Sequence, residues 1–418
     1  MTGKPDAIVI GAGAIGVCSA YYLAERGLTV TLVDRDDVCA GCSYGNAGLL
    51  VPSHSVPLAS PGVIWQALRW MFKPDSPFYI RSRLSPELIS WLWKFRAACN
   101  ADHVARAMPV IRDLTVKSIG LFEDLAEVCD TDFGFEKMGV MYIYDTDEAL
   151  RDGVEEAEHL RVVGLEAELL DRSAVLAKLE GVQTTAIGGV FHPYDGHLTP
   201  YKYVEAVAER FESNGGRIER ETEVQGFETD GRRVAAVVTN HGVLEADEIV
   251  LAAGSWSPAI ARHLGIRLTI QPAKGYSVAY RRPDGAPPLP LVLGETRVAV
   301  TPMGDRMRLA GTLEMAGMDL SLNRRRVDAV ARSLGRYFPA LGAADLDLIE
   351  EWAGLRPATP DGLALLGRWP SYDNLTIAAG HGMLGVSTSP ASGTLVAQIV
   401  TDEEPLTDLA LLDPTRFG

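Results

Sequence analysis

The chain carries glycines at positions 11, 13 and 16, in the run Gly-Ala-Gly-Ala-Ile-Gly, a spacing typical of a loop that binds a pyrophosphate. An apolar run over 7–10 precedes the loop, and a stretch with helical character, 17–26, follows it. The first glycine permits a tight turn, the second lets backbone N–H groups approach a phosphate, and the third lets helix and strand pack closely. The positive end of the helix attracts the phosphate charge. The residues expected at the pyrophosphate are Gly11, Gly13, Ala14, Ile15 and Gly16.

An acidic residue follows at the distance such a unit requires. A second apolar run, 28–33, ends in Asp34, with Arg35 beside it. A carboxylate at the tip of the second strand accepts hydrogen bonds from a ribose 2′-OH and repels a 2′-phosphate. Strand, glycine loop, helix, strand and acid in this order predict a site for a dinucleotide, FAD or NAD. The alternative is a glycine-rich turn without a ligand.

Composition limits the partners and the compartment. The net charge of −16 argues against nucleic-acid binding, which needs a basic surface. Five cysteines in 418 residues fit a reducing compartment, and we expect a cytoplasmic protein without a leader peptide. Cys39 and Cys42 form a CxxC pair, which allows a metal ligand pair or a redox pair. No second such pair exists, so we expect no metal and interpret the two as small side chains packed in a turn.

The segment 61–98 differs from the rest of this acidic chain. It holds four of the seven tryptophans and six basic residues against two acidic ones. Aromatic and basic side chains together suit a membrane interface, which predicts peripheral contact with the inner face of the cell membrane. The alternative is a pair of ordinary helices that covers the active site.

The order of elements predicts an α/β fold with two domains. Strands alternate with helices near both ends of the chain, and the middle is rich in strands. We therefore expect a discontinuous Rossmann-type nucleotide-binding domain with an inserted, mainly antiparallel α+β substrate domain, and a site where the two meet. A helix is expected over 150–179. The nucleotide-binding domain is assigned 1–55, 150–226, 245–260 and 345–418, and the substrate domain 56–149, 227–244 and 261–344.

Further motifs give the chain a resemblance to the D-amino acid oxidase superfamily of flavoproteins, and within it to the D-amino acid dehydrogenases. The resemblance extends over nearly the whole chain. Two positions depart from the usual pattern: Thr199 stands where an Asp is usual, and Cys42 where a hydroxyl or acidic residue is usual. The motifs that carry the resemblance are residues 43–48, 57–62 with 66–70, 188–190 with 195–196 and 200, 274–277, 354–357 with 360–362, and 380–385.

The resemblance implies non-covalent FAD rather than NAD, and oxidation of an amine by hydride transfer from Cα to the flavin. Hydrolysis of the imine gives a 2-oxo acid and ammonia, and a cyclic substrate gives a cyclic imine. The protein must hold Cα–H against the flavin and favour the neutral amine. The further residues expected at the cofactor are Ser43, Asn46, Ala47 and Gly48 at the flavin and pyrophosphate, Val224 at the adenine, Ala253 and Gly254 after a later strand, and Gly382, Met383, Leu384 and Gly385 at the flavin.

Four side chains are expected at the substrate. We expect the guanidinium of Arg356 to form two parallel hydrogen bonds with the substrate carboxylate. The alternative is that Arg356 forms an ordinary salt bridge within the protein. Tyr276 would hydrogen-bond that carboxylate, or be a core tyrosine with a satisfied hydroxyl. His381 would stabilise the reduced flavin, or only close a loop. His54 lies where the chain leaves the flavin loop.

Three functions remain open on these grounds. The first is a dehydrogenase for D-amino or D-imino acids that passes electrons to a quinone or a similar partner. The second is an oxygen-using oxidase of glycine or N-methyl amino acids. The third is the flavin subunit of a multi-subunit dehydrogenase, for example one acting on hydroxy-D-proline. The sequence leaves the oligomeric state open.

Overall fold

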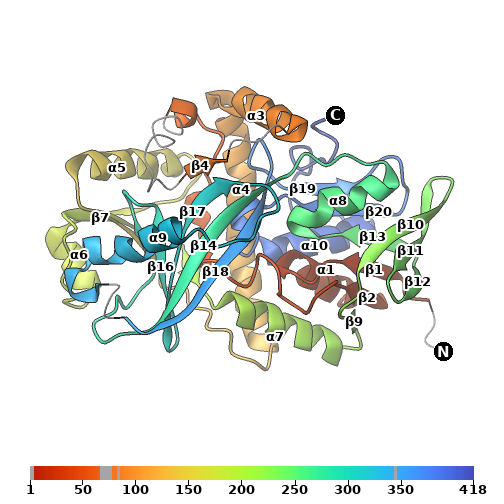
Figure 1. Ribbon diagram of the computed structural model, residues 1–418, viewed down its shortest axis with the longest axis horizontal. Helices are drawn as coiled ribbons and strands as arrows, with labels where there is room; N and C mark the ends of the chain where they lie inside the picture. Colours follow the sequence, from red (N-terminus) through yellow and green to blue (C-terminus); the bar gives the residue numbers. More distant parts are fainter. Residues whose placement is uncertain (1–3, 66–77, 82–84, 343–345) are drawn as a thin grey trace.

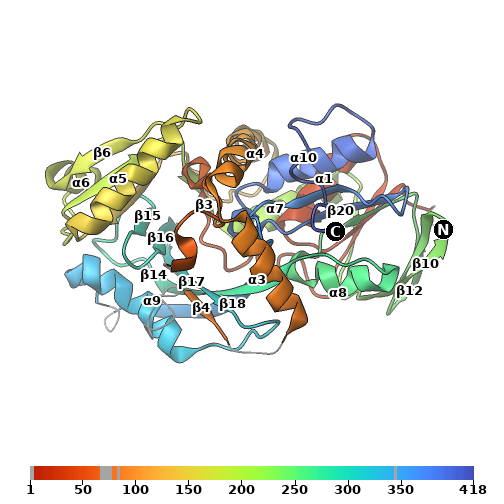
Figure 2. The same cartoon turned by 90° about the horizontal axis from the view of Figure 1, so that it is seen from above.

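A computed structural model describes residues 4–65, 78–81, 85–342 and 346–418, and all structural statements below concern these residues. Two sheets organise the chain (Figure 1). A six-stranded sheet lies with α1, α8 and α10, and a nine-stranded sheet lies with α5, α6 and α9. The long helix α4 (Ala101–Val128) lies between α5 and α10 when the molecule is seen from above (Figure 2).

The six-stranded sheet is the nucleotide-binding part of the fold. Its strands come from widely separated segments, as expected for a discontinuous domain. Five strands are parallel, and β19 at the edge is antiparallel to its neighbour. All four residues of β1 and of β2 are buried, so these strands are continuous apolar runs in the sequence. In sheet order the strands are β19 (Leu365–Arg368), β20 (Leu375–Ala379), β13 (Glu248–Leu251), β1 (Ala7–Ile10), β2 (Val30–Val33) and β9 (Arg217–Glu219).

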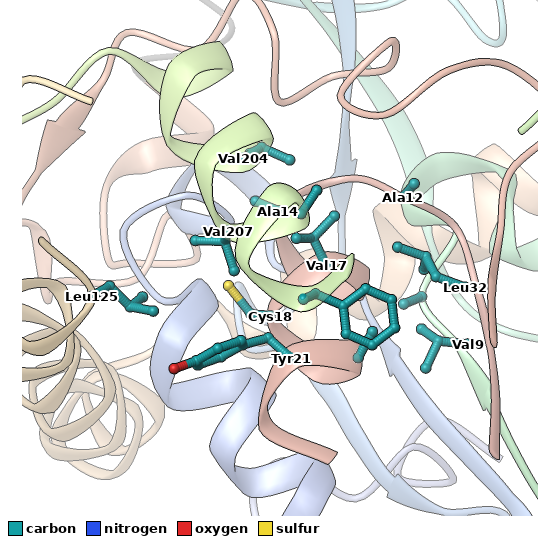
Figure 3. Close-up of a cluster of buried hydrophobic side chains, with 14 of the residues drawn as sticks. Val9, Ala12, Ala14, Val17, Cys18, Tyr21, Leu32, Leu125, Val204 and Val207 are labelled. Carbon is teal, nitrogen blue, oxygen red and sulfur yellow. The ribbon is translucent and has the colours of Figure 1, made fainter. Parts of the chain in front are cut away.

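Helix α1 (Ala14–Ala24) connects β1 to β2 and is apolar on nearly all sides. It packs against the sheet and against two further helices, α7 (Pro200–Ser213) and α10 (Ser389–Val400). Figure 3 shows the resulting cluster, in which Val17 and Cys18 lie among side chains of β1, β2, α4 and α7. A helix that is buried all round holds its N-terminal end in a fixed place.

The nine-stranded sheet is mainly antiparallel, and helix α9 (Arg324–Tyr337) packs on β14, β16 and β17. Helices α5 (Asp147–Arg161) and α6 (Arg172–Lys178) pack against β5, β6 and β7. The sheet order is β18 (Leu348–Ala358), β14 (Gln271–Arg281), β17 (Arg306–Met315), β16 (Val298–Met303), β15 (Leu291–Leu293), β5 (Val140–Tyr144), β7 (Gly188–His192) and β6 (Glu168–Asp171), and β4 (Phe78–Ile80) pairs with β17.

Smaller elements complete the fold. A three-stranded sheet packs on the six-stranded one through Val234 and Val237. The two-residue strands β3 (Leu49–Leu50) and β8 (Gly196–His197) pair with each other. The remaining elements are β10 (Val224–Asp230), β11 (Arg233–Thr239), β12 (Gly242–Glu245), α3 (Pro86–Ala98), α8 (Ser257–Ala261) and the 3₁₀ turns η1 (Pro52–His54), η2 (Gly254–Trp256), η3 (Arg262–Leu264), η4 (Pro339–Leu341) and η6 (Gly382–Leu384).

Strand pairing groups some segments differently from the division expected from the sequence. Within 150–226, strands β6 and β7 pair with each other and β7 with β5, so they belong to the nine-stranded sheet. Strand β18 pairs with β14 along its whole length, although it was placed with 345–418. Residues 227–244 instead pack on the six-stranded sheet. The helix expected over 150–179 is also interrupted by β6. Long-range pairing decides these assignments, and it leaves no local signal in the sequence.

Candidate active site

A single cavity of about 1670 Å³ extends from the carboxyl ends of β1, β2 and β13 to the nine-stranded sheet. Asp34 lines one end, and Arg356 of β18 lines the part formed by the second sheet. Ligands of open parallel sheets bind outside the carboxyl ends of the strands, so the position agrees with the site expected from the sequence.

The glycine loop is built so that side chains are excluded. Gly11 has a φ of +108°, and its N–H donates to the Val33 carbonyl at 2.8 Å. A β-carbon at Gly16 would overlap the carbonyl oxygen of Gly11, because α1 begins directly against the turn. Gly13 precedes α1 and lines the cavity. The loop thus leaves the start of the helix open to a ligand.

Asp34 supports the same loop. One carboxylate oxygen accepts from the Ala12 N–H at 2.6 Å and the other accepts from the Asp36 N–H at 2.9 Å. Burial raises the pKa of Asp34, and the two backbone hydrogen bonds oppose this shift. The carboxylate therefore orders the loop and faces the cavity at the same time.

Residues 43–48 cross the cavity between the two sheets. The Ser43 hydroxyl accepts from the first amide of α1, that of Ala14, at 3.0 Å. From the other side, the buried Arg308 of β17 donates to the carbonyls of Tyr44 at 2.8 Å and Asn46 at 3.1 Å. Trp352 lies directly against Gly45. Both sheets therefore hold this loop.

Most of the residues expected at the cofactor line the cavity, and two do not. Gly16 lies behind the loop, as its packing role requires. A β-carbon on Gly48 would overlap the Leu198 carbonyl and Met303, and Gly48 is not among the lining residues, so its expected place beside the flavin stays a prediction. Those that do line it are Gly11, Gly13, Ala14, Ile15, Asp34, Arg35, Ser43, Asn46, Ala47, Val224, Ala253, Gly254, Gly382, Met383, Leu384 and Gly385.

Arg356 lies flat across the neighbouring strand. A β-carbon on Gly275 would overlap its guanidinium, so the glycine makes room for it. Its Nη1 donates to the Thr312 carbonyl at 2.7 Å, and burial lowers its pKa. No ion pair with an acidic side chain is found for Arg356 within the described residues. Arg356 is partly exposed to the cavity, and a guanidinium there without an anion is arranged to receive one.

The backbone around Thr312 fits this role. Thr312 has a φ of +68°, which is uncommon for a β-branched residue. It lies in a β-bulge, where Thr312 and Leu313 together lie opposite Gly275. Such backbone strain persists where the surrounding structure holds it, often at binding sites.

Tyr276 does not join Arg356. Arg356 pairs with Ala273 and covers Gly275, so residue 276 points to the opposite face of β14. There its hydroxyl donates to Glu314 at 2.7 Å, and the ring packs in the core beneath α9. Although Tyr276 is among the residues that line the cavity, its ring lies in the core and its hydroxyl is bound to Glu314, so the alternation of the strand argues against the expected contact with a carboxylate.

Both histidines expected at the substrate line the cavity. His381 is buried, its Nε2 lies 3.1 Å from the Ser392 hydroxyl of α10, and burial lowers its pKa to about 4. Burial also lowers the pKa of His54, with Glu156 opposing the shift and Arg297 adding to it. Both imidazoles are therefore neutral at pH 7.

Several residues of the site were missed by sequence reasoning. Tyr142, Arg308, Thr312 and Trp352 sit inside strands of the nine-stranded sheet. Side chains in these strands alternate between the two faces, as in any strand. Neither the spacing nor the composition of the sequence therefore distinguishes these four residues as members of the site. Cys39 and Cys42 form no disulfide with each other. Cys39 is buried, whereas Cys42 lines the cavity, and burial raises the pKa of the Cys42 thiol to about 11. No group of three metal-ligating side chains occurs in the described parts of the chain.

Comparison with known proteins agrees with this geometry. A family model described as FAD dependent oxidoreductase matches residues 6–399. The chain belongs to this family. FAD is therefore the cofactor, which decides between the two dinucleotides left open by the glycine loop.

Relatives of this FAD dependent oxidoreductase match nearly its whole length. It is 34% identical to a D-amino acid dehydrogenase of Bradyrhizobium diazoefficiens over 417 residues, 98% of each chain. It is 35% identical to a D-amino acid dehydrogenase of Methylobacterium radiotolerans, over 95% of this chain and 96% of that one. Glycine oxidase of Geobacillus kaustophilus has a similar fold, with a TM-score of 0.77, 23% identity and 99% of both chains covered.

Proposed function

We propose that this FAD-dependent enzyme oxidises D-amino acids, or cyclic D-imino acids, to 2-oxo acids or cyclic imines. The observation that carries the proposal is the guanidinium of Arg356, which faces the cavity without an acidic partner among the described residues. A substrate carboxylate supplies the missing charge. The names of the full-length relatives support the D configuration.

The residues of the cavity fit FAD. The glycine loop and the first turn of α1 suit the pyrophosphate, and Asp34 suits the ribose hydroxyls. Ser43, Asn46 and Ala47 would hold the central part, and residues 382–385 the flavin ring. FAD supplies the acceptor for the hydride that leaves Cα of the substrate.

The protein's own part in the reaction is binding and orientation. Arg356 fixes the carboxylate through two parallel hydrogen bonds, and the Thr312 carbonyl fixes Arg356 in turn. A carboxylate held in this way fixes one end of the substrate, and contacts with the amine or the side chain then select the configuration. The neutral His381 would donate to or accept from the ring without adding a charge.

The proposal is tested by anaerobic flavin bleaching. The purified protein is expected to be yellow, to hold one FAD per chain that acid or heat releases, and to bleach with D-amino acids. A panel of D-, L- and N-alkyl amino acids would identify the substrate class. Bleaching by glycine or N-methyl amino acids alone would favour the oxidase function, and reconstitution with NAD but never with FAD would contradict the cofactor.

The electron acceptor requires a separate experiment. We propose a quinone, and expect ubiquinone analogues to support faster turnover than dissolved oxygen. Stoichiometric hydrogen peroxide release during turnover in air would contradict this and favour an oxidase. Copurification with iron–sulfur subunits would instead favour a flavin subunit of a larger dehydrogenase.

Residues 61–98 are the part of the chain we assign to a membrane-bound acceptor. Residues 66–77 and 82–84 lie outside the described residues. Of the pair of helices expected in 61–98, only α3 can therefore be considered. Helix α3 exposes Trp93 at 70% and Ile89 at 61%, a surface that would suit a lipid interface. No described helix is both long and apolar enough to span a bilayer.

A further inference from the structure

A row of residues crosses the nine-stranded sheet on the side of the cavity. Each member is the direct partner of the next in the pairing of β18, β14, β17, β16, β15 and β5. All members but Ser277 line the cavity. An aromatic ring lies at each end, and the side chains between them are small or of medium size. In order the members are Trp352, Ser277, Ala310, Ala299, Val292 and Tyr142.

The alternation of the strands turns this row toward the cavity. On β16, Val298 and Val300 pack in the core beneath α9, so Ala299 between them lies on the opposite face. On β17, Leu309 belongs to the same core, and Ala310 beside it lines the cavity. The two methyl groups therefore form part of the cavity floor.

The row lies next to the guanidinium of Arg356. This group covers Gly275 of β14 and donates to the Thr312 carbonyl of β17. Ser277 follows Gly275 by two residues on the same face of β14, a separation of about 7 Å, and its partner on β17 is Ala310. A carboxylate bound to Arg356 therefore leaves the rest of an amino acid within reach of the small side chains of the row.

Large side chains close the row at both ends. A β-carbon on Gly45 would overlap the Trp352 ring, so this ring is fixed between β18 and the loop 43–48. At the other end, Tyr142 and Leu384 pack against Val51 and its buried neighbours. We call the space over Ala310 and Ala299, between the two rings, the recess. Its walls and floor are apolar, and its floor is low because two successive members of the row end at a β-carbon.

The charged lining residues on this side of the cavity lie outside the row. On the side of the nine-stranded sheet, the acidic ones come from α5. Asp152 and Glu155 are exposed, so water solvates them, and Glu156 lies 3.7 Å from Arg297, which offsets its charge. The row itself contains no charged side chain that would bind an ionic group of a substrate.

We propose that the recess binds the substrate's side chain, and that Ala299 and Ala310 select D-amino acids with a branched or aromatic apolar side chain. The inference rests on the proposed function, because the carboxylate at Arg356 places the rest of the substrate over the row. Burial of a leucine or phenylalanine side chain strengthens binding by about 10- to 100-fold over the methyl group of alanine. Ala299 and Ala310 are therefore specificity-determining residues.

Steady-state kinetics of the holoenzyme with three substrates test the recess. In the wild type, kcat/KM should be at least about tenfold higher for D-phenylalanine and D-leucine than for D-alanine. Ala299→Leu fills the recess. It should lower kcat/KM for D-phenylalanine by about 10²-fold and change that for D-alanine by less than about threefold. A wild-type preference for D-alanine, or an equal loss for both substrates in the variant, overturns the proposal.

Two further variants separate specificity from a general effect on the fold. Val292→Ala lengthens the recess toward Tyr142 and should raise kcat/KM for D-tryptophan relative to D-phenylalanine by about tenfold. A loosened fold would not produce such a gain, and an unchanged ratio contradicts the recess. Ala235→Leu makes the same substitution as Ala299→Leu at an exposed position of β11 and should leave every ratio unchanged.

Ligand binding gives a readout apart from turnover. 3-Phenylpropionate and propionate carry a carboxylate but no amine, so the enzyme cannot oxidise them, and the change in the flavin spectrum measures their binding. The wild type should bind 3-phenylpropionate at least about tenfold more tightly than propionate, and Ala299→Leu should lose this preference while it keeps its FAD. Equal affinities in the wild type, or loss of FAD from the variant, overturn the recess alone. Failure of every D-amino acid to bleach the wild-type flavin overturns the proposed function itself.

Discussion

Replacing Arg356 by Ala should lower kcat/KM for the D-amino acid by about 10²- to 10⁴-fold. The loss of one partner of a buried, hydrogen-bonded charge pair costs about 3–5 kcal/mol, because the substrate carboxylate is then buried without its counter-charge. Most of the effect should appear in KM, since the guanidinium binds the carboxylate in both ground and transition states. The flavin spectrum and FAD content should not change, which steady-state kinetics on the holoenzyme would check.

Two further arginine variants make this result specific. Arg356→Lys should remain strongly impaired, because an ammonium group cannot form two parallel hydrogen bonds with a carboxylate. Arg281→Ala, on the neighbouring strand β14, removes an exposed arginine that pairs with Asp347 and should change kcat/KM less than about twofold. Unchanged kinetics in Arg356→Ala would show that the carboxylate binds elsewhere.

Gly16→Ala should abolish FAD binding and destabilise the fold by about 3 kcal/mol or more. The added β-carbon would overlap the Gly11 carbonyl oxygen, which is backbone and cannot move away as the end of a long side chain could. Either α1 shifts away from the loop or the loop loses its turn. FAD content after reconstitution and urea unfolding of the apoprotein would measure the two effects.

Gly120→Ala in α4 is the matched control. Nothing lies within 4 Å of a β-carbon there, and the residue is exposed in a helix interior. Alanine should therefore stabilise the protein by about 0.5–1 kcal/mol and leave FAD binding intact. A Gly16→Ala protein that keeps its yellow colour would contradict the close packing of α1 on the glycine loop.

The cofactor end of the site could be predicted from the sequence because it is local. Gly11, Gly13 and Asp34 lie within one βαβ unit, where spacing fixes geometry. Arg356 was found through a motif, yet its partner Thr312 comes from another strand whose bulge no local pattern reveals.

Tyr276 shows why the rest was harder to predict. The sequence places it on a strand beside the site, but the face on which a strand residue points depends on register. Pairing of β14 with β18 puts Arg356 and Gly275 on one face and Tyr276 on the other. Arg308 was missed for a related reason: a buried charge in a β-rich segment has no sequence signal until its hydrogen-bond partners are known.

The order of strands in the six-stranded sheet also constrains when the protein can mature. The central strand β1 lies between β2 and β13, and β13 is completed by β20, which begins only at Leu375. Residues 382–385, which line the cavity, follow later still. Pairing of such distant segments is slow, because long loops must close before the contacts form. A ribosome must therefore synthesise almost the whole polypeptide before the complete cavity can form, and C-terminal truncation should yield colourless, aggregation-prone protein.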